Sequence, residues 1–150
     1  MNVVELALKQ VGAAEVPKGS NRGPVVDQYT GGNAVPWCAL FTSWLFRAVG
    51  RDLPGDYAPS PGKMSDYCSV SKTEDVFQNH GWYFMAPEAG DLVFYSDRGL
   101  SDAGPGRHIG LVVAVHADYI ETVEGNWGQE VAHRKVKRSS PKIVGYGRRP

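Results

Sequence analysis

The hydrophobic pattern of this chain changes near Gly81, and that change constrains the fold more than any other feature. Before Gly81 the apolar residues recur every three to four positions, as in helices, and after it they form short runs bounded by turn residues, as in strands. Helices followed by antiparallel strands predict an α+β fold. With 150 residues and no internal repeat, residues 1–150 are expected to form one domain.

The elements can be placed from their periods and from the residues that start and stop them. The predicted helices cover residues 2–11, 24–29 and 36–49, and further helical turns are expected at 64–67 and 73–79. The predicted strands cover residues 90–95, 109–115, 119–124, 131–136 and 143–146. Residues 51–62 and 97–107 are rich in turn formers and are predicted to be irregular connections.

The third predicted helix carries a cysteine in its first turn. Pro36 suits the opening of a helix, Cys38 follows directly, and Gly50 supplies the stop. Unpaired amides and the positive end of the helix dipole favour a thiolate there, and the thiolate is the nucleophilic form. We therefore hypothesise that Cys38 is a catalytic nucleophile, although a cysteine in such a place is more often an inert buried residue.

The other cysteine, Cys68, has no clear helix start before it and is interpreted as inert. A disulfide between Cys38 and Cys68 would abolish thiol chemistry, and the sequence alone leaves that alternative open.

A catalytic cysteine needs a base, which is usually a histidine held by a third polar group. His80 resembles a surface residue near a helix end, His116 falls in a predicted hairpin turn, and His133 lies in a basic stretch. His108 stands where a glycine-rich loop meets the strongest predicted strand, so it combines a rigid support with room for a substrate. We therefore assign the base to His108.

The strands at 109–115 and 119–124 are close enough to form a hairpin. If residues 116–118 form a three-residue loop, His108 lies opposite Asn126 and Gly110 lies opposite Glu124. A two-residue loop would turn Glu124 and Asn126 away from His108, because side chains alternate along a strand. The catalytic interpretation thus predicts an odd loop length.

In this register Val115 pairs with Tyr119, and the side chains of His108, Glu124 and Asn126 share one face. The helix that carries the thiol is then expected to pack on that face. Glu124 or Asn126 would hold the imidazole in its useful tautomer. The alternative is that both are only turn residues on either side of a glycine.

Composition excludes several other functions. The 16 basic and 16 acidic residues cancel, so no overall charge favours nucleic acid or an anionic membrane. The sequence has no apolar run long enough to span a membrane and no secretory signal at its start. It also lacks the Gly-x-Ser-x-Gly, His-Glu-x-x-His, phosphate-loop and dinucleotide-binding motifs.

Five motifs, in order along the chain, resemble those of CHAP domains, the cysteine, histidine-dependent amidohydrolases/peptidases of the NlpC/P60-like group. They are Pro36-Trp37-Cys38-Ala39, Gly90-Asp91-Leu92-Val93-Phe94-Tyr95, His108-Ile109-Gly110, Glu124-Gly125-Asn126-Trp127 and the closing Gly145-Tyr146-Gly147-Arg148-Arg149-Pro150. The resemblance implies a papain-like fold, with N-terminal helices packed on an antiparallel sheet. It also implies hydrolysis of peptidoglycan, as an N-acetylmuramoyl-L-alanine amidase or an endopeptidase.

The resemblance further implies roles for individual residues. Cys38 matches the nucleophile, His108 the base, Glu124 the orienting acid and Asn126 an additional polar residue of the site. The acyl group would pass through a thioester on the cysteine. Residues 29–36 contain no Asp-x-Asp, unlike the segment that binds calcium in some relatives, so we expect no calcium requirement, no other metal and no cofactor.

Four more residues are candidates for substrate contact. Tyr29 could donate a hydrogen bond to the oxyanion, as an upstream tyrosine does in some related enzymes, and Trp37 and Trp127 could line a groove for a sugar-peptide. Asn21 lies in a loop that could touch the substrate. For Tyr29 and Trp37 the alternative is core packing, and for Asn21 it is a solvated turn.

The expected partner is peptidoglycan, and a monomer is expected. Without a signal sequence, the protein would be made in the cytoplasm and reach the wall through a holin, a phage particle or a secretion system. Two rival functions remain open: a toxin or phage-tail protein held by an immunity or structural partner, and a Cys–His acyltransferase in which an amine replaces water.

Overall fold

The computed structural model describes residues 1–97 and 107–150, so the loop predicted at 97–107 lies outside the described residues except at its two ends. The helices are α1 (Val3–Gln10), α2 (Val26–Thr30), α3 (Cys38–Ala48), the short 3-10 helix η1 (Asp66–Cys68) and α4 (Val70–Asn79). The strands are β1 (Tyr83–Phe84), β2 (Leu92–Tyr95), β3 (His108–Val115), β4 (Tyr119–Trp127), β5 (Glu130–Lys137) and β6 (Ile143–Gly147). The predicted α+β fold is confirmed.

Local sequence explains where the helices begin and end. Asn2 and Glu5 form a reciprocal capping box at the start of α1, and Ser69 caps α4 by accepting a hydrogen bond from the amide of Lys72. Gly31 ends α2 in the left-handed conformation, with φ of 67°. Within the described residues, none of these helices is both long and apolar enough to cross a membrane.

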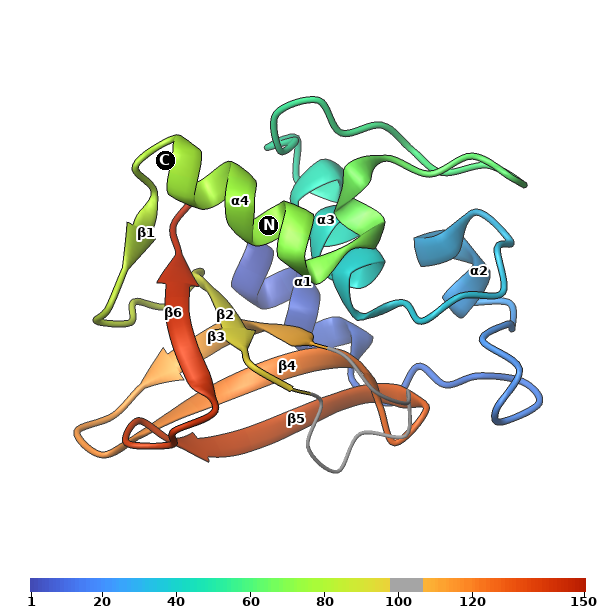
Figure 1. The fold of residues 1–150 in the computed structure, drawn as a ribbon. Helices are drawn as coiled ribbons and strands as arrows, with labels where there is room; N and C mark the ends of the chain where they lie inside the picture. The colour runs from blue at the N-terminus through green and yellow to red at the C-terminus, as the bar shows by residue number, and fades with distance from the viewer. Residues whose placement is uncertain (98–106) are drawn as a thin grey trace.

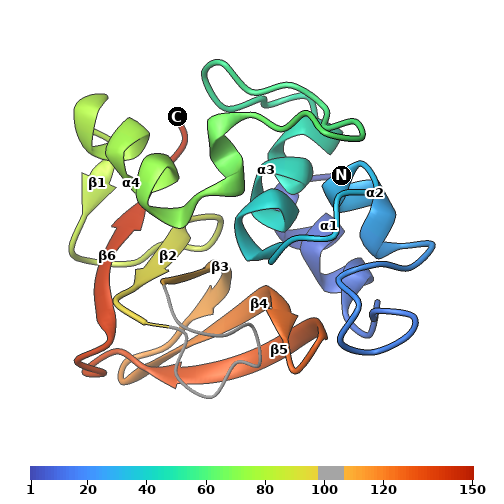
Figure 2. The ribbon, with the colours of Figure 1, turned by 45° about the vertical axis from the view of Figure 1, so that its right-hand side comes forward.

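The six strands form one antiparallel sheet in the order β1-β6-β2-β3-β4-β5. The helices gather on one side of this sheet, and α3 lies closest to its centre, over β3 and β4 (Figures 1 and 2). The predicted arrangement of N-terminal helices packed on an antiparallel sheet is confirmed.

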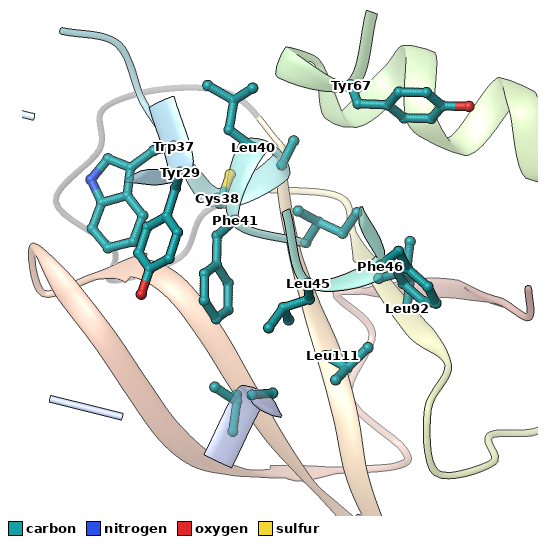
Figure 3. Packing of buried hydrophobic residues seen from close by; sticks show 14 of the residues in the cluster. Tyr29, Trp37, Cys38, Leu40, Phe41, Leu45, Phe46, Tyr67, Leu92 and Leu111 are labelled. Carbon is teal, nitrogen blue, oxygen red and sulfur yellow. The ribbon is translucent and has the colours of Figure 1, made fainter. Parts of the chain in front are cut away.

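The main core fills the space between α3 and the sheet. Phe41 and Leu45 of α3 are fully buried in a cluster that includes Ile109, Leu111 and Val123 of the sheet. Figure 3 shows Phe41, Leu45 and Leu111 in this cluster. Burying a side chain of this size contributes about 1.5–3 kcal/mol. The other face of the sheet carries a smaller cluster, formed by Val93, Tyr95, Val112, Ile120, Val136 and Tyr146.

The turn between β3 and β4 corrects one prediction. Val115 pairs with Ile120 rather than with Tyr119, and the amide of His116 donates to the carbonyl oxygen of Tyr119 at 2.9 Å. Residues 116–118 do lie between the two strands, but the predicted pairing of Val115 with Tyr119 is wrong, because the register at the turn is shifted by one residue.

An irregularity between Val112 and Ala114 then restores the predicted register beyond the turn. One extra residue on β3 shifts the pairing back, so that Leu111 lies opposite Val123. Continuing this register places Gly110 opposite Glu124, as the sequence predicted, but a bulge rather than the loop length sets it.

Candidate active site

Cys38 is the first residue of α3, as predicted. The first hydrogen bond of the helix runs from the amide of Phe41 to the carbonyl of Trp37 at 2.8 Å, so the amides of the first turn precede the helical ladder. Only 2% of Cys38 is exposed, yet it lines a cavity of about 290 Å³. Its other lining residues are Pro36, Cys68, Ser69, Val70, Ser71 and Arg107.

His108 is buried, with 1% of its surface exposed, and it interacts with both Cys38 and Glu124. Its Nε2 lies 2.9 Å from Oε1 of Glu124. Among the described residues Nδ1 has no hydrogen bond of ordinary geometry, so Nδ1 is the nitrogen left for the thiol. Burial alone would lower the pKa of His108, but Cys38 and Glu124 outweigh burial and raise it to about 9.

The Glu124 carboxylate is completely buried, and four side chains among the described residues hold it. Oε1 lies 2.9 Å from Nε2 of His108 and accepts from Nη1 of Arg134 at 2.6 Å, while Oε2 accepts from the hydroxyls of Tyr95 at 2.6 Å and Thr122 at 2.8 Å. Burial would raise the pKa of Glu124, but these partners, His108 foremost, lower it to about 2. The group is thus an ionised carboxylate inside the protein.

Asn126 lies two residues after Glu124, in an irregular stretch of β4, and only 2% of it is exposed. Its backbone is left-handed, with φ of 59°, a conformation that asparagine adopts more readily than most residues. Its Nδ2 has no hydrogen-bond partner among the described residues. A buried amide donor without a partner is costly, so this atom is a candidate to bind a ligand.

Gly110 explains how Glu124 can reach His108. A Cβ atom at Gly110 would lie 2.5 Å from Cγ of Glu124 and 3.0 Å from its Cδ. The Glu124 side chain therefore crosses over the bare backbone of β3 on the face that His108 shares, since residues 108 and 110 alternate with 109 and 111.

The expectation that the thiol-bearing helix packs on the face of His108 and Glu124 is wrong. Phe41 packs with Ile109 on the opposite face, and a Cβ at Gly125 would lie 2.7 Å from Cβ of Phe41. His108 is the first residue of β3, so Cys38 meets it at the end of the strand rather than across a face of the sheet.

Two predicted substrate contacts belong to the core instead. Tyr29 and Trp37 are fully buried, and Figure 3 shows the Tyr29 hydroxyl pointing away from Cys38. That hydroxyl donates to Oε1 of Gln10 at 2.6 Å, and Nε1 of Trp37 donates to buried Glu15 at 2.8 Å. With no exposed surface and satisfied polar atoms, neither side chain can line a groove, so the predicted roles are wrong.

The other two candidates have different surroundings. The half-buried ring of Trp127 lies 5.6 Å from the ring of His108, so it borders the site. Asn21 lies in the turn between α1 and α2 in a left-handed conformation, with φ of 55°. Substrate contact by Trp127 and Asn21 stays a prediction.

The three rejected histidines all have contacts with other groups. His116 and His133 flank the carboxylate of Glu121, with Nε2 atoms at 2.7 and 3.1 Å, and Nδ1 of His80 lies 2.8 Å from the carbonyl oxygen of Val76. Neither cysteine forms a disulfide, so the alternative of a bridge between Cys38 and Cys68 is not realised.

Sequence reasoning missed three residues that hold Glu124: Tyr95, Thr122 and Arg134. Arg134 directly follows His133 in the basic stretch, where nothing in the local sequence distinguishes it from its neighbours. The signal that could have found Arg134 is its pairing with Thr122 in the β4–β5 ladder, but this pairing is known only once the register of β5 is known.

Within the described residues no group of three or more His, Cys, Asp or Glu side chains is placed to hold a metal ion, and the absence of a calcium requirement stays a prediction.

The model of the CHAP-domain family matches residues 30–126 of the sequence, which is more than half of the chain. This chain belongs to the CHAP-domain family. The match begins before the nucleophile candidate and ends at Asn126, and it confirms the resemblance inferred from the motifs. A search of curated proteins finds no relative of this CHAP domain.

Solved structures support the same fold. The crystal structure of Ly7917 with the hydrolyzing product of MDP superposes on this CHAP domain with a TM-score of 0.59 and 19% identity, covering 96% of this chain and 60% of Ly7917. A second crystal structure of Ly7917 gives a TM-score of 0.58 and 19% identity, covering 97% and 60% of the two chains. This CHAP domain therefore spans 60% of the length of these neighbours, and the likeness establishes the fold.

Proposed function

We propose that this CHAP domain is a peptidoglycan hydrolase that cleaves an amide bond in the peptide part of the bacterial cell wall. One observation carries the proposal: a buried imidazole links a thiol that lines a cavity to an ionised, fully buried carboxylate. This is the nucleophile, base and orienting group that acyl transfer from an amide requires.

In the first half of the proposed reaction, Sγ of Cys38 attacks the carbonyl carbon of the amide. The raised pKa of His108 keeps the imidazole protonated beside the sulfur, and this positive charge favours the thiolate. His108 then gives its proton to the leaving nitrogen as the C–N bond breaks. The products are a free amine and a thioester on Cys38.

In the second half, water attacks the thioester carbon and gives a proton to His108. The C–S bond breaks, a carboxylic acid leaves and the thiolate returns. Glu124 stays ionised throughout and holds the imidazole through Nε2, so that Nδ1 faces the sulfur. The amides of the first turn of α3 are proposed to stabilise the oxyanion, together with Nδ2 of Asn126, which has no partner among the described residues.

Two comparisons support peptidoglycan as the substrate. The CHAP family model covers the proposed nucleophile, base and acid, and a neighbour of the same fold, Ly7917, has been crystallised with the hydrolyzing product of MDP. The choice between an amidase and an endopeptidase depends on which bond of the wall is cut.

Purified peptidoglycan treated with wild type, Cys38→Ala and His108→Ala tests the proposal, with mass spectrometry of the released fragments. Wild type should release new amino groups, and both variants should lose activity by about a thousandfold or more. Free lactyl groups on muramic acid would identify an amidase, and cuts within the peptide an endopeptidase. Thermal melting checks that each variant is folded.

The two parts of the proposal fail separately. If folded wild type releases no fragments from peptidoglycan, the substrate is wrong. If Cys38→Ala cleaves as well as wild type, the nucleophile is wrong. Fragments joined to an added amine instead of water would reassign the domain as an acyltransferase.

A further inference from the structure

Arg134 lies on β5, two strands away from His108, and its side chain reaches into the proposed active site. Nη1 donates to Oε1 of Glu124 at 2.6 Å, and this is the same oxygen that lies 2.9 Å from Nε2 of His108. The Arg134 side chain is 23% exposed, whereas the Glu124 side chain has no exposed surface. Among the described partners of the carboxylate, the arginine alone links the buried site to the surface.

The position of the guanidinium is fixed from a second direction. Its central carbon lies 3.5 Å from the ring centroid of Trp127, in the geometry of a cation–π contact. On the other strand, Thr122 pairs with Arg134 across the β4–β5 ladder and donates to the second oxygen of Glu124. A guanidinium held by a ring and a carboxylate at once has little freedom, and it leaves the carboxylate little freedom in turn.

We propose that Arg134 is a positioning residue for the reaction, which acts through Glu124 by keeping that carboxylate fixed and ionised beneath the imidazole of His108. The proposal rests on the proposed function in one respect, because it takes Cys38 and His108 as the reactive pair. Arg134 is not required to touch the substrate or the reacting atoms.

The charges around Glu124 determine what removal of Arg134 does. In the part of the chain that the structure describes, four groups face the carboxylate: His108 from β3, Tyr95 from β2, Thr122 from β4 and Arg134 from β5. Tyr95 is a neutral donor whose pKa is raised well above its ordinary value by burial and by Glu124. Of the two positively charged partners, Arg134 carries a permanent charge, whereas the charge of His108 depends on pH.

Removal of a permanent positive charge makes every nearby titratable group hold its proton more tightly. Without Arg134, Glu124 loses a charged hydrogen bond that offsets its burial, and the negative charge of the site is less balanced. The thiol of Cys38, which lies across His108 from Glu124, should then form a thiolate only at higher pH. We expect the midpoint of thiolate formation to rise by about half a unit to one unit.

The rate of Cys38 alkylation by iodoacetamide, measured as a function of pH, tests this without any wall substrate. Mass spectrometry of the peptide containing Cys38 separates its alkylation from that of Cys68. The variants are Arg134→Met and Arg134→Gln, which remove the charge, and Arg134→Lys, which retains it. Lys137→Met is the matched control, because it removes one positive charge from an exposed position on the same strand.

Arg134→Met and Arg134→Gln should move the alkylation midpoint upward, so that the rate on the acid side falls about 3- to 10-fold. The alkylation midpoint of Arg134→Lys should stay close to that of wild type. The pH profile of Lys137→Met should superimpose on the wild-type profile. Arg134→Gln keeps a donor for Glu124, so it still reports if Arg134→Met does not fold.

Unshifted midpoints in both charge-removing variants would overturn the proposal, and so would an equal fall in rate at every pH. An equal shift in Lys137→Met would show a general charge effect and would overturn it as well. If wild-type Cys38 itself titrates like an ordinary cysteine, near 8.5, the reactive pair of the proposed function fails instead.

Discussion

Gly110 offers a direct test of the geometry that joins Glu124 to His108. In Gly110→Ala the new Cβ would lie 2.5 Å from Cγ of Glu124 and 3.0 Å from both Cδ and Oε2. Carbon atoms in contact lie about 3.5–4.0 Å apart, so one of the two groups must move by about 1 Å. Gly110 lies in the middle of the sheet, paired with Val93, so the side chain of Glu124 is the part that yields.

The size of the effect follows from what Glu124 loses. A displacement of about 1 Å in a catalytic array costs about a hundredfold in rate, and the imidazole of His108 depends on Glu124 for its orientation. Overpacking of a core costs about 1–3 kcal/mol of folding free energy. We therefore expect Gly110→Ala to fold, to melt at a lower temperature, and to lose about a hundredfold or more in kcat/KM.

The control is Gly147→Ala, in the same sheet. Its Cβ would lie 2.7 Å from a ring carbon of Phe77 and 3.0 Å from a ring carbon of Phe94, in the core and away from Glu124. Both variants are compared by thermal melting and by initial rates of peptidoglycan hydrolysis. Gly147→Ala should lose stability with little loss of kcat/KM while folded. Full activity in folded Gly110→Ala would refute the role assigned to the crossing of Glu124 over β3.

Two further predictions concern charges in the site, and a third concerns a hydrogen bond in the core. Glu124→Gln keeps the shape but removes the negative charge that raises the pKa of His108, so the alkaline limb of the kcat/KM profile should move to lower pH, and an unmoved limb would contradict this. The pKa of His108 is about 9 in the folded protein and 6.5 in the unfolded chain, so its contribution to stability is complete below pH 6.5 and is lost as the pH rises through 9. The melting temperature should therefore fall between pH 6 and pH 10, and His108→Gln should reduce this fall. Trp37→Phe removes the indole donor to buried Glu15 and should cost about 1–3 kcal/mol in urea unfolding, and an unchanged midpoint would show that this hydrogen bond contributes nothing.

The register of the β3–β4 hairpin shows how far the sequence could lead. Alternation of side chains correctly grouped His108 with Glu124, because parity along a strand holds once the pairing is known. The predicted pairing of Val115 with Tyr119 at the turn was wrong, but the bulge between Val112 and Ala114 restores the predicted register beyond it. Residues 111–115 are uniformly apolar, so no break in the pattern marks the position of the extra residue.

Other features could not be predicted because they depend on contacts between distant segments. Arg134 differs little in sequence from its basic neighbours Lys135 and Lys137, and only the pairing of β4 with β5 separates it from them. Trp37 flanks the thiol in sequence, but it precedes a helix whose apolar side faces the core, so its ring points inward while Cys38 lines the cavity. Adjacency in sequence therefore did not mean adjacency in the site.

The tripeptide Glu124-Gly125-Asn126 joins the two halves of the fold, and each of its residues has a separate physical reason. Glu124 points to the face of His108 and fixes the imidazole, while Gly125 points to the opposite face, where a Cβ would lie 2.7 Å from Phe41 of α3. The absence of a side chain at Gly125 lets α3 approach the sheet closely enough to bring its first residue to the imidazole. Asn126, in a left-handed conformation, has a buried amide donor without a partner among the described residues. The position of the Cys38 thiol thus depends on Gly125, and the orientation of the His108 imidazole depends on the neighbouring residue, Glu124.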